Sequence, residues 1–188
     1  MSRLASINPA EATGEARQLL DAVQGALGVT PNFVKVFATA PKALGGYLQL
    51  SGSLKNGLLD EATQERLALA VGEANACQYC VSAHTAIGSK AGLDSDEIAA
   101  NRAGSSGDAK AAAALTFARK LVENQGDVTS ADIQAVRNAG FGDGEIVEII
   151  AHVALNILTN YLGKVGQVEI DFPEVELLPK ADTEALAR

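Results

Sequence analysis

Both cysteines of the chain and one of its two histidines lie in one octapeptide, Cys77-Gln-Tyr-Cys80-Val-Ser-Ala-His84. Each residue of an α-helix advances by about 100°, so Cys77, Cys80 and His84 would share one helix face, within an arc of roughly 60°. Two thiols in disulfide reach beside an imidazole are typical of a redox or nucleophilic site. The octapeptide therefore predicts a helix that carries thiol chemistry.

Helices are also predicted on both sides of the octapeptide. Asn75 followed by Gln78 resembles a capping box, which would place Cys77 in the first turn of a new helix that ends near Ala91. Short polar residues before apolar runs predict further helix starts. These starts are Asp60, Asp94, Asp108, Thr129 or Ser130, and Asp143, with long helices ending near Gly126 and at or beyond Gly163.

The N-terminal part of the chain has the same helical periodicity. Apolar residues at 3–4 spacing predict helices over Pro9–Leu27, from Thr30-Pro31 through Phe37, and over Pro41–Asn56. Alternation typical of a strand is confined to Val168–Phe172. The expected fold class is therefore all-α.

Composition limits the classes of protein to consider. The 188 residues suit a single domain, 1–188, and 47% apolar residues suffice for a real core. Aromatic residues are only 4% and Trp is absent, which favours closely packed helices with small aliphatic side chains. A net charge of −8 argues against nucleic acid and anionic membrane surfaces as partners.

Location is also inferred from the sequence. No segment reaches the roughly 20 apolar residues that span a bilayer, and the N-terminus lacks the apolar region of a signal peptide. The apolar stretch 146–162 contains Glu, His and Asn residues, so a buried helix is expected there. We expect a cytoplasmic protein, in which Cys-x-x-Cys is more often catalytic or metal-binding than structural. The tail after Asp171 is expected to be an extended arm.

The residues of the octapeptide leave several kinds of site open. The positive end of a helix would favour a thiolate, His84 can take the proton of Cys80, and Cys77 can attack a sulfenic acid formed on Cys80. A structural zinc site needs four ligands, but only His152, far off in sequence, could join these three. A thioredoxin-like site should follow a strand, but the residues on both sides of the octapeptide are predicted to be helical, which argues against that fold. Alternatively, the two cysteines could be buried and act only as small hydrophobic residues, without a chemical role.

Three further ionisable residues could contribute to the site. His152 lies among apolar neighbours, so we expect a core or interface residue without a catalytic role. Glu65 would lie about 120° from Cys77 on one straight helix, and reaches the site only if the chain breaks near residues 72–75. A solvated glutamate is the commoner fate of such a residue, and Glu73 is a competing carboxylate.

The spacing of these residues resembles a known family. Glu65, eleven residues, Cys77-Gln-Tyr-Cys80, three residues and His84 are similar to the signature of alkyl hydroperoxidase D-like (AhpD-like) proteins, in the carboxymuconolactone decarboxylase superfamily. Thr30-Pro-Asn-Phe33 and Ala40-Pro41 resemble its peroxidase-related members. The resemblance covers residues 30–92 and continues more weakly through 143–165.

The resemblance implies an AhpD-like helical bundle, assembled as a trimer or hexamer. It implies reduction of organic hydroperoxides at the expense of a thiol or dithiol reductant, without cofactor or metal. By position, Cys80 matches the peroxidatic cysteine, Cys77 the resolving cysteine, and His84 and Glu65 a proton relay. The family prototype often carries a histidine where this chain has Tyr79.

Two other functions are weighed against a peroxidase. A lyase like the superfamily's namesake decarboxylase is not expected to rely on two cysteines. A non-enzymatic redox sensor or metal-binding module would use the same pair without catalytic turnover.

Overall fold

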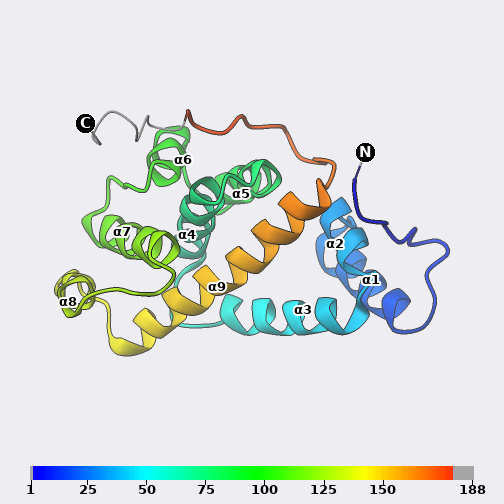
Figure 1. The fold of residues 1–188 in the computed structure, drawn as a ribbon, viewed down its shortest axis with the longest axis horizontal. Coiled ribbons are helices and arrows are strands. Elements are labelled where there is room, and N and C mark those ends of the chain that lie inside the picture. The colour runs from blue at the N-terminus through cyan, green and yellow to red at the C-terminus, as the bar shows by residue number, and fades with distance from the viewer. Residues whose placement is uncertain (1, 180–188) are drawn as a thin grey trace.

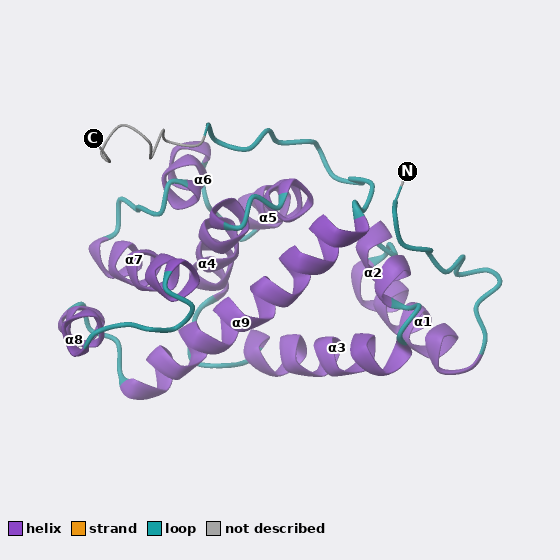
Figure 2. Ribbon diagram, viewed as in Figure 1, coloured by secondary structure: helices purple, strands orange, loops and turns teal. Residues whose placement is uncertain are grey.

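The computed structural model describes residues 2–179. Within that range the chain forms nine helices and no strand, which confirms the all-α prediction (Figure 2). The helices are α1 (Gly14–Leu27), α2 (Asn32–Phe37), α3 (Pro41–Lys55), α4 (Glu61–Ala74), α5 (Gln78–Lys90), α6 (Ser95–Arg102), α7 (Ala109–Glu123), α8 (Ser130–Asn138) and α9 (Asp143–Gly166). The segment 168–172 is irregular chain, so the strand pattern there does not form a strand.

Helix α9 crosses the middle of the bundle, with α1–α3 on one side and α4–α8 on the other (Figure 1). It contacts α2, α3, α4, α5 and α7. One apolar core joins α1–α3 to the start of α5, and a second joins α4, α7 and α8 to the first half of α9. Leu67, Val71 and Ile149 of the second core are completely buried. Each such burial contributes roughly 1.5–3 kcal/mol, so α4 and α9 form a stable frame for the site.

Helix α9 is unusually apolar. The helix has 24 residues, and an apolar window of 18 of them has a mean hydropathy of 1.4, which is enough, by length and composition alone, to cross a membrane. Within the bundle 44% of that apolar window is buried, and the buried residues include His152, Asn156 and Asn160. The prediction of a buried helix is thus confirmed for the inner face of α9.

Four short polar side chains cap the helices that follow them, as predicted. Each accepts a hydrogen bond from the backbone N–H three residues on, which satisfies a donor that the first turn leaves unpaired. The capping residues are Asp60, Asp94, Asp108 and Thr129. The predicted start of α1 near Pro9 is wrong: Asn8 accepts from the backbone N–H of Ala10 in a separate turn, and the helix begins at Gly14. Helix α7 ends at Glu123, short of the predicted end.

The predicted capping box at Asn75 and Gln78 is wrong. The N-cap of α5 is Cys77, whose Sγ accepts a hydrogen bond from the backbone N–H of Cys80. The side chain of Asn75 instead donates to Oδ1 of Asn160 on α9, at 2.9 Å. A partner 85 residues away, which local spacing does not reveal, therefore takes the side chain that was expected to cap α5.

Helix α4 ends in a tight turn that reverses the chain into α5. Asn75 is its C-cap, and Ala76 adopts the left-handed region with φ of 52°. The backbone N–H groups of Ala76 and Cys77 donate to the carbonyls of Glu73 and Gly72, both at 2.9 Å. This is the Schellman pattern, in which the left-handed position is usually glycine. The turn folds α5 back against α4.

The chain after α9 runs over α5 and α6 as an extended arm (Figure 1). Its backbone is held by side chains: Val175 N–H donates to Ser82 Oγ at 3.0 Å, and Leu178 N–H donates to Glu73 Oε1 at 2.6 Å. The predicted arm is therefore confirmed as far as residue 179. Its remaining residues, 180–188, lie outside the described part of the chain.

Candidate active site

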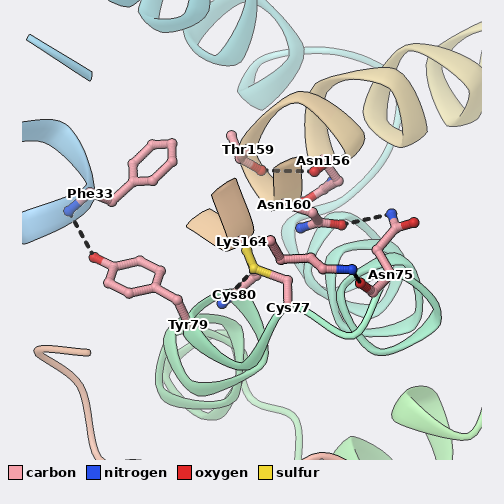
Figure 3. Close-up of a disulfide and its surroundings, with 9 residues drawn as sticks. All are labelled: Phe33, Asn75, Cys77, Tyr79, Cys80, Asn156, Thr159, Asn160 and Lys164. Carbon is pink, nitrogen blue, oxygen red and sulfur yellow. Dashed lines mark hydrogen bonds between the residues drawn. A yellow bond between two sulfur atoms is a disulfide. The ribbon is translucent and has the colours of Figure 1, made fainter. Parts of the chain in front are cut away.

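Cys77 and Cys80 form a disulfide at the N-terminus of α5, with their Cα atoms 5.3 Å apart (Figure 3). The backbone N–H of Cys80 donates to Cys77 Sγ at 3.4 Å. The two residues are only 1% and 4% exposed. A helix N-terminus carries a partial positive charge that stabilises a thiolate. The cysteines thus lie where thiolates are favoured once the bond is reduced, but they are enclosed by protein.

Glu65 of α4 and His84 of α5 form a hydrogen-bonded pair. Nδ1 of His84 lies 2.7 Å from Oε2 of Glu65, and their side chains are 24% and 14% exposed. The left-handed turn at Ala76 makes the contact possible, because it folds α5 back along α4. The separation of about 120° expected for a straight helix therefore does not apply.

The Glu65 carboxylate controls the charge of His84. Burial alone would lower the pKa of His84, but the charge of Glu65 and its hydrogen bond outweigh burial and raise the pKa above its usual value. The Glu65 carboxylate therefore favours the imidazolium form more than burial alone would allow. His84 follows Cys80 by one turn of α5, where an imidazolium stabilises a thiolate or supplies a proton.

The competing carboxylate, Glu73, has a structural role. Its Oε2 pairs with Nε of Arg102 at 2.8 Å, and both side chains are nearly buried. Its Oε1 accepts from the arm at Leu178. Glu73 thus joins α4, α6 and the arm, and the structure pairs Glu65 rather than Glu73 with the histidine.

Tyr79, between the two cysteines, is tied to both ends of the chain. Its hydroxyl accepts from the backbone N–H of Phe33 at 3.3 Å (Figure 3). It donates to Asp171 Oδ1 at 2.9 Å. Its ring meets Phe172 edge-on, with centroids 5.8 Å apart. Burial, and then the Asp171 carboxylate, raise the pKa of Tyr79. Tyr79 therefore anchors the arm and keeps its proton.

Helix α9 supplies a wall of the site, and the packing of Gly163 in that wall was not predicted from the sequence. A Cβ atom on Gly163 would lie 3.2 Å from Cys77 Sγ and 3.8 Å from Cys80 Sγ, so the helix backbone packs directly on the disulfide. Asn160, one turn earlier, holds Asn75, and Lys164 Nζ donates to the Asn75 carbonyl at 2.5 Å (Figure 3). The polar residues and glycines of this otherwise apolar helix were the sequence signal that could have indicated its place in the site.

His152 is a buried residue of α9, as predicted, with 5% of its surface exposed. Its Nε2 has no hydrogen-bond partner among the described residues. Burial lowers its pKa, against the smaller opposing effects of Glu148 and Glu65. Among residues 2–179, no three His, Cys, Asp or Glu side chains are grouped to hold a metal ion.

Two cavities lie away from the disulfide. One of about 210 Å³ has Arg66 and Lys110 in its lining, and one of about 310 Å³ has Gln24 and Lys35. Neither is lined by a cysteine or by either residue of the Glu65–His84 pair.

Fold and site together define the class: an all-helical protein with a Cys-x-x-Cys pair at the N-terminus of a helix, whose histidine pairs with a carboxylate of the preceding helix. Residues 41–120 match the model of the carboxymuconolactone decarboxylase family. This segment, which is similar to that family, contains Glu65, both cysteines and His84.

Solved structures extend the likeness over most of the chain. An uncharacterized peroxidase-related protein with an alkylhydroperoxidase AhpD core, from Ralstonia eutropha JMP134, is 26% identical, with a TM-score of 0.82 over 90% of this chain and 92% of that one. A peroxidase-related protein from Silicibacter sp. TM1040 is 23% identical, with a TM-score of 0.77 over 88% and 90%.

The debrominase Bmp8 is 15% identical, with a TM-score of 0.75 over 90% of this chain and 92% of that one. The Silicibacter and Bmp8 structures show likeness of fold alone. The AhpD-like fold prediction is confirmed by the first of these structures. None of the curated proteins compared with the chain matches it in sequence.

Proposed function

We propose that this chain is a thiol-dependent peroxidase that reduces organic hydroperoxides with Cys77 and Cys80. The observation that carries the proposal is a disulfide-bonded Cys-x-x-Cys pair on the same helix as a histidine paired with a partly buried carboxylate. The likeness to a peroxidase-related protein with an AhpD core supports the same chemistry.

The proposed cycle begins with the reduced pair. The Cys80 thiolate attacks the outer peroxide oxygen, the O–O bond breaks, and the alkoxide leaves as an alcohol with a proton from His84. Cys80 is then a sulfenic acid. The Cys77 thiolate attacks its sulfur, which forms the disulfide and releases hydroxide that is protonated to water. Two electrons from an external thiol or dithiol restore both thiols.

The return step sets a structural requirement. An attacking thiolate must reach one sulfur of the disulfide, yet Cys77 and Cys80 are at most 4% exposed. The first turn of α5 or the chain covering it must therefore open during reduction. A reducing compartment, such as the cytoplasm, would supply the reductant.

Mass spectrometry of the reduced protein after substoichiometric alkyl hydroperoxide tests the proposal. We expect the Cys77–Cys80 disulfide in the wild type, and a trapped sulfenic acid on Cys80 in Cys77→Ser. Cys80→Ser is the matched control and should consume no peroxide catalytically. Undiminished turnover by Cys80→Ser would remove Cys80 from the role of attacking thiol.

Two other experimental outcomes would indicate a different function. Turnover of a lactone acid by a variant lacking both thiols would indicate a lyase. A disulfide that forms without catalytic peroxide consumption would indicate a redox sensor.

We also propose that copies of the chain associate through the outer face of α9. That face exposes large apolar side chains at helical spacing, which an oligomer would bury. They are Val147, Ile150, Leu158, Tyr161 and Val165. Light scattering should give a multiple of the chain mass, reduced by Tyr161→Lys; a single-chain mass for the wild type at low micromolar concentration would contradict the proposal.

A further inference from the structure

Asn160 lies on the face of α9 that carries Gly163, the residue whose backbone packs on the disulfide. Residues three apart on a helix share a face, and a Cβ on Gly163 would lie 3.2 Å from Cys77 Sγ. Asn160 has no exposed surface. Figure 3 shows its amide between the disulfide and Asn75. The buried amide of Asn160 is thus a polar group on the face of α9 that packs on the disulfide.

Hydrogen bonding fixes which way this amide points. Oδ1 of Asn160 accepts from Nδ2 of Asn75 at 2.9 Å. With the Asn75 amide oriented as it is, the reverse orientation of Asn160 would set two NH₂ groups against each other. The observed orientation leaves Nδ2 of Asn160 buried without a partner. An unpaired buried N–H is unfavourable, and such groups in native proteins generally serve another state or ligand.

Reduction of the disulfide creates the missing acceptor. A disulfide sulfur accepts hydrogen bonds weakly, whereas a thiolate is a charged and strong acceptor. Of the two sulfurs, Cys77 Sγ packs closer to this face of α9, at 3.2 Å rather than 3.8 Å from the Gly163 Cβ position. The same sulfur already accepts from the Cys80 backbone N–H. The ammonium of Lys164, bonded to the carbonyl of Asn75, adds positive charge nearby.

We propose that Nδ2 of Asn160 donates a hydrogen bond to the Cys77 thiolate in the reduced protein, and that Asn75 positions the amide for it. The two sulfurs then have separate polar groups. His84 with Glu65 serves Cys80 from α5 and α4, and Asn160 with Asn75 serves Cys77 from α9.

The donor acts on both steps that involve Cys77. As a thiolate, Cys77 attacks the Cys80 sulfenic acid: the S–S bond forms, the S–O bond breaks, and hydroxide takes a proton to leave as water. In the reverse direction an external thiolate attacks Cys80, and the electron pair of the broken S–S bond goes to Cys77 as the leaving thiolate. Stabilising the Cys77 thiolate speeds the second step, in which Cys77 leaves, and raises the fraction of thiolate that is present for the first. This use rests on the proposed function, but the hydrogen bond itself does not.

The thiol pKa of Cys77 tests the inference without any peroxide. In a Cys80→Ser background Cys77 is the single thiol, and thiolate ultraviolet absorbance reports its ionisation even when it is buried. Adding Asn160→Leu keeps the branched shape of the side chain, at a larger volume, and removes the donor. A charge-assisted hydrogen bond is worth about 1.5–3 kcal/mol, so the pKa of Cys77 should rise by about 1–2 pH units.

Asn156→Leu is the matched control, because its amide donates to the His152 carbonyl within α9 rather than to the site. It should leave the pKa of Cys77 unchanged. Asn75→Ala should raise the pKa by less than Asn160→Leu does, since the donor remains but is no longer held. Asn160→Ala provides a second donor-free variant should the leucine disturb the fold.

A Cys77 pKa that is the same with and without Asn160 would overturn the inference. An equal rise in Asn156→Leu and Asn160→Leu would also overturn it, because packing of α9 would then explain the change. Peroxide turnover of the wild type is measured separately. A wild type without turnover but with the expected pKa differences would reject the peroxidase and keep the hydrogen bond.

Discussion

Gly163 is the position where one added methyl group should disturb the disulfide most directly. In Gly163→Ala the new Cβ would lie 3.2 Å from Cys77 Sγ, closer than an ordinary van der Waals contact. Overpacking of this kind costs about 1–3 kcal/mol, whereas alanine in a helix interior gains about 1 kcal/mol over glycine. The net expectation is a loss of up to about 2 kcal/mol in the free energy of unfolding.

Gly46→Ala on α3 is the matched control, because nothing lies within 4 Å of its Cβ position. It should stabilise the protein by about 0.5–1 kcal/mol. For a chain of this size 1 kcal/mol corresponds to about 2–4 °C in Tm, so thermal unfolding at equal protein concentration separates the two variants. The loss in Gly163→Ala should shrink after reduction, when Cys77 Sγ is free to rotate. Equal stabilisation by both substitutions would refute the close packing of α9 on the disulfide.

Three further perturbations probe the surroundings of the site. Ala76→Gly relieves a left-handed residue at φ of 52° and should stabilise the protein by about 1 kcal/mol, measured as a higher urea midpoint; a lower midpoint would contradict the strain. Glu65→Gln should lower the pKa of His84 in an NMR titration. Because Glu65 raises that pKa, the pair stabilises the fold below the usual histidine value of about 6.5, and this contribution is lost as the pH rises through the folded pKa. The variant should lack this pH dependence. Asp171→Ala removes the acceptor of the Tyr79 hydroxyl and should speed proteolysis of the arm; unchanged cleavage would show that the arm is held elsewhere.

Features determined by neighbouring residues could be predicted from the sequence. The caps at Asp60, Asp94 and Asp108 each need only a side-chain oxygen and a backbone N–H three residues later, and all three form. Asn75 has the same local pattern, yet its amide pairs with Asn160 instead. Local spacing does not contain the competing partner, which exists only after α9 has packed.

In the candidate site, too, some features follow from local spacing and others only from tertiary packing. The closeness of Cys77 and Cys80 follows from their spacing, but the pairing of Glu65 with His84 depends on the turn at Ala76, for which glycine is the usual signal. Spacing alone favoured a solvated glutamate, and only the family resemblance indicated otherwise. The packing of Gly163 on the disulfide comes from tertiary structure, and local spacing does not reveal it.

The place of α9 in the chain has a consequence for biosynthesis. Its residues 143–166 enclose a disulfide whose cysteines are translated some eighty residues earlier. At about 5–20 residues per second, roughly 4–17 s pass between synthesis of the two thiols and arrival of the helix that covers them. Pulse-labelled nascent chains should therefore react with an alkylating reagent at both cysteines, whereas released protein should resist it. During those seconds the chain is most open to bonding with the wrong thiol.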